Sequence, residues 1–137
     1  MKIEKEKIIH FPEGIPAFEE EKEFVIILNH DSPFSYLQSV KDKDLSFIII
    51  NPFEIFNDYD IIIPETARNR LKIERQEDVM IYTIVVIPEN IENTTTNLLG
   101  PIVINTREML GKQVILDDER YSTKHFIFNK DSQRKVE

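Results

Sequence analysis

Short apolar runs alternate with turn-forming residues along most of the chain. The runs are rich in Ile, Val and Phe, which pack well on a pleated sheet. They cover residues 8–9, 24–28, 47–50, 61–63, 79–87, 102–104, 114–116 and 126–128. Each run is bounded by Pro, Gly, Asn or Asp, which favour turns and end strands. This pattern predicts an all-β fold of eight short strands, either a small antiparallel β-barrel or a sandwich.

Several of these runs are apolar at successive positions, so both faces of the sheet are covered there. A closed or strongly curved sheet produces this pattern in a small protein. Segment 64–73 is the exception and predicts one short helix of about two turns. Pro64 suits a helix start, Glu65 suits the positive end of the helix dipole, and Ala67 and Leu71 share one face. We expect this helix to cap an end of the barrel.

The length of 137 residues predicts a single domain spanning residues 1–137, large enough to bury its own core. Residues 129–137 carry no motif and are expected to form a frayed tail. The longest apolar run, 79–87, falls far short of the ~20 residues that span a bilayer. Because no signal-peptide pattern stands at the N-terminus either, we expect a soluble, cytoplasmic protein with no membrane association.

Acidic residues outnumber basic ones by 25 to 17, which leaves a net charge of −8. Such a field repels phosphate backbones and favours basic partners. A nucleic-acid binder of the OB type needs exposed aromatic residues on a basic groove, and the Lys and Arg residues form no basic stripe along this chain. The charge therefore argues against direct nucleic-acid binding.

Candidate chemistry is sparse along the chain. The absence of cysteine excludes disulfides, thiolate metal sites and a cysteine nucleophile. His10, His30 and His125 have none of the spacings of metal ligands, and Asp117 to Glu119 lack the alternation and glycine of a calcium loop. No nucleophile elbow or glycine-rich phosphate loop occurs. We expect neither catalysis nor a metal or cofactor.

Two segments next to prolines have the composition of interfaces. Residues 34–39 follow Pro33, and residues 51–56 contain Pro52, which prevents a regular central strand. Both mix aromatic side chains with amide or hydroxyl groups, and aromatic residues are enriched at binding hot spots. The alternative interpretation is that Phe53 and Phe56 close the ends of the barrel.

Taken together, segments along almost the whole chain resemble the FliW family of flagellar assembly factors. The matching segments are 11–18, 33–39, 47–52, 78–88, 96–105 and 111–116. The most specific are the Leu-Gln-Ser element at 37–39 and the Thr-Asn-Leu…Pro-Ile-Val-Ile-Asn element within 96–105.

The resemblance implies a β-barrel-like fold without enzymatic activity. Similar proteins bind flagellin in the cytoplasm. Once flagellin is exported, the free factor binds CsrA, a small dimeric RNA-binding repressor of flagellin translation, and relieves the repression. We expect a monomer, because a surface that exchanges partners has to be free in solution.

The predicted partner-binding residues lie in segments that the pattern assigns to loops, where rigid barrels carry their function. They are Phe34, Leu37, Gln38, Asn51, Phe53, Asn97 and Leu98. For Asn97 the alternative is a structural hydrogen bond within its own turn. The alternative function is a small-ligand-binding β-barrel module, which requires an internal cavity of roughly 300 Å³ or more.

Overall fold

A computed structural model describes residues 4–128, which fold mainly into β-strands. The predicted tail, 129–137, lies outside these residues. The strands are β1 (Ile9–His10), β2 (Glu23–Ile27), β3 (Ser35–Ser39), β4 (Ser46–Ile50), β5 (Val79–Val86), β6 (Thr95–Thr96), β7 (Ile102–Asn105), β8 (Leu110–Gln113) and β9 (His125–Phe126). The helices are α1 (Pro52–Ile55) and α2 (Glu65–Arg70), with 3-10 turns at Lys5–Lys7, Gln76–Asp78 and Ile91–Asn93. No helix within residues 4–128 is long and apolar enough to cross a membrane.

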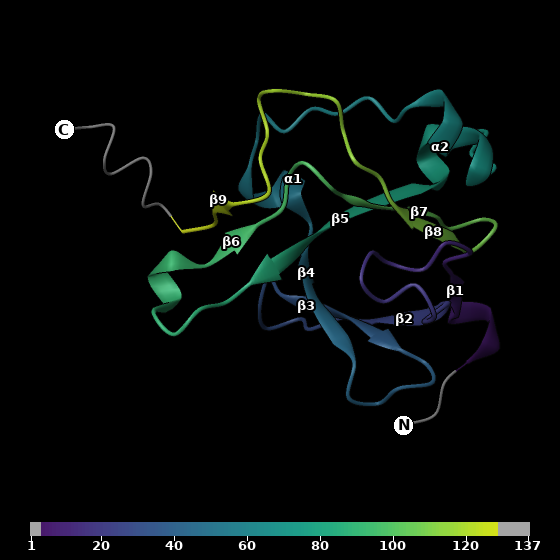
Figure 1. Cartoon of the computed structure of the whole chain (residues 1–137), viewed down its shortest axis with the longest axis horizontal. Helices are drawn as coiled ribbons and strands as arrows, with labels where there is room; N and C mark the ends of the chain where they lie inside the picture. Colours follow the sequence, from purple (N-terminus) through teal and green to yellow (C-terminus); the bar gives the residue numbers. More distant parts are fainter. Residues whose placement is uncertain (1–3, 129–137) are drawn as a thin grey trace.

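The strands close into a barrel, which confirms the predicted fold class (Figure 1). Their order is β4-β3-β2-β1-β8-β7-β5, and the ring closes because β5 also pairs with β4. β6 and β9 extend the sheet beyond β5. Neighbouring strands are antiparallel except β1 and β8, which form a parallel pair at His10 and Leu110. The prediction of a purely antiparallel sheet is therefore wrong at this one contact.

Several predicted element boundaries are wrong. Residues 61–63 pair with no described strand, and the strand near 114–116 lies earlier, at β8. β3 and β6 were not predicted because they are rich in serine and threonine. Both strands form because a neighbouring strand offers hydrogen-bond partners, which apolar patterning does not detect.

Residues 4–128 contain two short α-helices rather than the single one predicted. α2 lies in the expected segment, with Ala67 and Leu71 buried. The unpredicted α1 starts at Pro52, and the side chain of Asn51 accepts a hydrogen bond from the backbone N–H of Phe53. A proline at the first helical position and an asparagine cap are favourable start signals.

Large side chains fill the interior of the barrel. The rings of Phe11 and Phe24 are fully buried and meet edge to face, with their centroids 5.3 Å apart. The buried cluster around them consists of Ile9, Ile15, Leu37, Ile49, Tyr82, Ile102 and Ile104. The interior thus holds packed side chains where the alternative function requires a ligand cavity.

A second core lies on the outer face of β5, β7 and β8. Here Val103 and Val114 pack together with Ala67 and Leu71 from the α2 region. Leu116 completes this buried cluster, and residues 61 and 63 pack against it. Helix α2 therefore covers the outside of the barrel wall, whereas the sequence pattern predicted that it caps an end (Figure 1).

Gly111 allows the ring of Phe11 to lie directly against β8. A Cβ at this position would stand 2.5 Å from Cζ of Phe11. We expect Gly111→Ala to lower the free energy of unfolding by about 2 kcal/mol, as overpacking a dense core does. Gly100→Ala is the matched control, because its nearest neighbours are side-chain ends at 3.0 to 3.2 Å. Its effect should stay within about 1 kcal/mol. Urea denaturation of both variants measures this difference, and equal effects would contradict the packing argument.

Candidate functional site: an apolar groove beside β5

The structure places two of the predicted partner-binding residues in the interior. Leu37 is 0% exposed and lies in β3, not in a loop, and Leu98 is 2% exposed. Leu37 belongs to the cluster inside the barrel. These two leucines support the fold, and in this conformation neither offers area to a partner.

Gln38 and Asn51 make local structural hydrogen bonds. The Nε2 atom of Gln38 lies 3.1 to 3.3 Å from the carbonyl oxygens of residues 39, 42, 43 and 45. It therefore holds the turn between β3 and β4. The Oδ1 atom of Asn51 accepts the N–H of Phe53 at 3.0 Å and starts α1.

Asn97 is bound within its own turn, as the structural alternative expected. Its Oδ1 accepts the backbone N–H groups of Leu99 at 3.0 Å and Gly100 at 2.8 Å. The backbone of Leu98, the residue after Asn97, is held as well, because the hydroxyl of Tyr59 donates to its carbonyl at 2.7 Å. Burial raises the pKa of this tyrosine above its ordinary value, so the phenol keeps its proton and donates.

We expect Asn97→Ala to lower the free energy of unfolding by about 1–2 kcal/mol, because two backbone donors lose their acceptor. The control is Asn97→Asp, which retains an oxygen at the same place and should remain close to wild type. Thermal unfolding measures both variants. If Asn97→Ala unfolds like wild type but loses affinity for a protein partner, then the side chain acts in recognition instead.

Asn51 and Phe53 do line a groove on the described surface. The groove has a volume of about 1000 Å³. Its walls are the loop after β2, helix α1, residues 60–63, residues 73–76 and the first half of β5. Phe34, the remaining predicted residue, is half-buried and does not line it.

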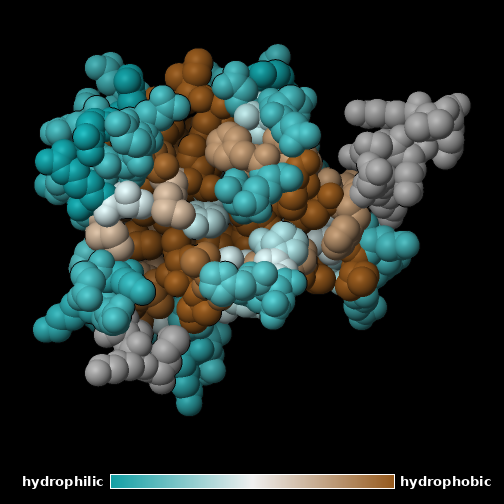
Figure 2. All heavy atoms as spheres, turned by 180° about the vertical axis from the view of Figure 1, so that it is seen from behind, coloured by the Kyte–Doolittle hydropathy of each residue, from teal (hydrophilic) through white to brown (hydrophobic). Residues whose placement is uncertain are grey.

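The groove is rich in exposed apolar side chains. Leu28, Phe53, Ile62 and Met80 line it, and Ile62 is 86% exposed. Hydrophobic side chains also gather across the middle of the face that is turned away in Figure 1, with hydrophilic groups around them (Figure 2). Exposed apolar side chains that are gathered in one place and rimmed by polar groups are a feature of protein-binding sites.

Charges of both signs surround the groove. Glu54 and Asp60 line it together with Arg68, and Arg75 is paired with Asp78 at 3.4 Å. The phenol of Tyr82 lies nearby, and its pKa is raised by burial and, to a lesser degree, by the charge of Glu54. The groove therefore has no single strong charge of its own, although the whole chain is acidic.

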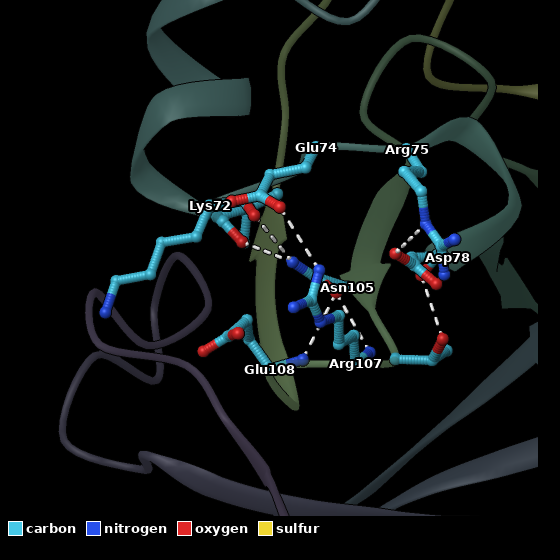
Figure 3. Close-up of polar contacts among 9 residues, drawn as sticks. Lys72, Glu74, Arg75, Asp78, Asn105, Arg107 and Glu108 are labelled. Carbon is cyan, nitrogen blue, oxygen red and sulfur yellow. Dashed lines mark hydrogen bonds and ion pairs between the residues drawn. The ribbon is translucent and has the colours of Figure 1, made fainter.

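A buried asparagine that sequence reasoning missed supports one wall of the groove (Figure 3). Asn105 is 1% exposed. Its Nδ2 donates to the carbonyls of Leu71 at 2.8 Å and Lys72 at 3.1 Å. Its Oδ1 accepts the N–H groups of Arg107 at 2.9 Å and Glu108 at 3.2 Å. One side chain thus ties the chain after α2, which continues into wall residues 73–76, to the turn between β7 and β8.

The position of Asn105 in the sequence carries a weak signal of this role. It ends the apolar run of β7, where an asparagine is usually read as a turn residue. Two ion pairs flank it, Glu74 with Arg107 at 3.1 Å and Arg75 with Asp78. Within residues 4–128, no three His, Asp or Glu side chains are close enough together to hold a metal ion.

Comparisons with known proteins agree on one family. A family model described as "FliW protein" matches residues 1–127. The flagellar assembly factor FliW of Caldicellulosiruptor saccharolyticus is 49% identical over 128 residues, which are 93% of this chain and 84% of that protein. The Bacillus subtilis protein of the same name is 46% identical over 93% of this chain and 90% of its own. A crystal structure of the flagellar assembly factor FliW superposes with a TM-score of 0.88 at 41% identity, covering 93% of this chain and 90% of that one.

Proposed function

Because the chain belongs to the FliW family of flagellar assembly factors, we propose that it binds flagellin and, when free of flagellin, binds the translational repressor CsrA. Binding to CsrA relieves the repression of flagellin translation, so the protein links translation to the level of unexported flagellin. Membership of the family is the observation that carries this proposal. The role consists of binding rather than catalysis and is carried out by a monomer in the cytoplasm.

The charge of the chain supports the CsrA part of the proposal. A surface that binds RNA is basic, and a protein with a net charge of −8 is attracted to it. Once docked beside the RNA site, the same charge repels phosphate. Antagonism is then partly electrostatic and does not require the RNA site itself to be occupied.

Calorimetric titration of the full chain with purified flagellin, and separately with purified CsrA, tests the proposal. We expect tight binding to each partner, and we expect flagellin to displace CsrA from the complex. An absence of binding to both proteins would overturn the proposed function while leaving the fold unaffected.

The electrostatic mechanism predicts a specific salt dependence. Release of RNA from CsrA by this protein should weaken as salt rises beyond roughly 0.15 M, where the Debye length is about 8 Å. A fluorescence assay with labelled RNA follows this release, with a parallel measurement of CsrA binding at each salt concentration. Undiminished release at high salt, with CsrA still bound, would contradict the mechanism.

A further inference from the structure

Along β5, the backbone N–H and C=O groups of successive residues point alternately to the two edges of the strand. The carbonyl of Asp78 accepts the N–H of Thr106, and the carbonyl of Ile84 accepts the N–H of Asn97. Even-numbered residues of β5 therefore face the edge occupied by β7 and β6. Because hydrogen-bonding direction alternates along a strand, Val79 and Ile81 face the opposite edge, where β4 lies.

β4 ends before it reaches this part of β5. The last paired residues are Ile50 and Thr83, and continuing the same register would place residue 52 opposite Ile81. Residue 52 is a proline that begins α1, so it has no N–H to offer and the chain turns away. Among residues 4–128, no hydrogen bond reaches the N–H or C=O of Ile81 on this edge. The edge is open.

The open edge lies in the apolar groove. Val79, Met80 and Ile81 all line it, together with the exposed side chains of Phe53 and Ile62. The stretch Val79–Tyr82 offers about 13 Å of strand, at roughly 3.3 Å per residue. An unpaired strand edge beside pockets for side chains recognises extended polypeptides, through main-chain hydrogen bonds and alternate side chains.

We propose that an extended polypeptide segment with apolar side chains at alternate positions binds in this groove and adds to β5 as a strand. The added strand would occupy the position that β4 would have if it continued beyond Ile50. The inference rests on the proposed function in one respect, which is that the segment belongs to flagellin. The groove is apolar with charges of both signs around it, whereas the attraction to the basic CsrA arises from the acidity of the whole chain. An apolar segment of flagellin therefore fits this groove better than a basic RNA-binding surface does.

The side-chain part of the proposal is tested with two matched variants, Ile62→Asp and Ile91→Asp. Both isoleucines are highly exposed, at 86% and 63%, and only Ile62 lines the groove. Titration with purified flagellin should show an affinity loss of about tenfold or more for Ile62→Asp, as expected for a hot-spot anchor. Ile91→Asp should bind like wild type, and both variants should keep wild-type affinity for CsrA.

The main-chain part is tested by amide hydrogen exchange of the full chain, with and without flagellin. The Ile81 amide should exchange at least about tenfold more slowly in the complex, because it gains a hydrogen bond. The amide of Met80 faces β7 in both states and serves as the internal control.

The outcomes separate the two proposals. If wild type binds flagellin but Ile62→Asp binds equally well, or if the Ile81 amide exchanges at the same rate in the complex, then the groove inference is overturned and the proposed function stands. If wild type binds no flagellin at all, the groove inference and the flagellin part of the proposed function are both overturned, while the CsrA part is decided by its own titration. A loss of CsrA affinity in Ile62→Asp, with flagellin affinity unchanged, would assign the groove to the other partner and would also overturn the inference.

Discussion

Replacing Leu37 by alanine is expected to lower the free energy of unfolding by about 3 kcal/mol, within the range measured for buried leucines. Leu37 is fully buried in β3 and packs inside the barrel. Its neighbours Ile26 and Phe47 stand directly across from it on β2 and β4. Because strands on both sides fix the backbone, the barrel wall has little freedom to collapse into the cavity that the substitution leaves.

Leu28→Ala is the matched control, because Leu28 is the same residue type near the end of β2 but 58% exposed. Its cost should remain below about 1 kcal/mol, as for surface substitutions generally. Urea denaturation followed by circular dichroism measures both variants. A stable Leu37→Ala protein with specifically reduced partner affinity would restore Leu37 as a contact residue and would contradict its assignment to the core.

Replacing Asn105 by aspartate is expected to lower the free energy of unfolding by about 3 kcal/mol or more, because a buried amide loses its donor and gains a charge. The Nδ2 atom that donates to the carbonyls of Leu71 and Lys72 becomes an oxygen facing two oxygens (Figure 3). The contacts made by Oδ1 to Arg107 and Glu108 remain possible. The substitution therefore isolates the donor side of the network.

Asn97→Asp is the matched control for Asn105→Asp, since both make the same chemical change. At Asn97 the hydrogen bonds within the turn use Oδ1 alone, so aspartate preserves them. Denaturation at neutral pH should show a large loss for the Asn105 variant only. Burial raises the folded-state pKa of a carboxyl introduced at position 105, so its stability should recover as pH falls towards and below that pKa. Equal stability of the two variants would show that the donor bonds of Asn105 contribute little.

Local sequence patterns were sufficient for the fold class and for helix α2. Runs of Ile, Val and Phe between turn residues predict short strands, and Pro64 with Ala67 and Leu71 predicts a helix with one buried face. Both signals depend on residues close together in the chain. The resemblance to the FliW family was also read from short segments in order, and the comparisons confirm it.

The same patterns failed where a residue's environment depends on distant strands. The serines at both ends of β3 are buried and made that strand look like a loop, which in turn suggested that Leu37 was a surface anchor. The local pattern gave Asn105 no role, although its side chain donates to carbonyls more than thirty positions earlier. Neither environment can be derived from neighbouring residues.

The sequence by itself determined that this chain forms a β-rich, acidic domain, because composition and short-range periodicity are properties of the chain. Its resemblance to the FliW family came separately, from short segments in a fixed order. Only the tertiary structure decided which surface is available. The Asn51-Pro52 pair ends β4 locally, but the open edge at Ile81 exists because closure of the barrel pairs β4 with β5 in one particular register. A strand edge is open or closed according to its neighbour in space, and that neighbour is about thirty residues away along the chain.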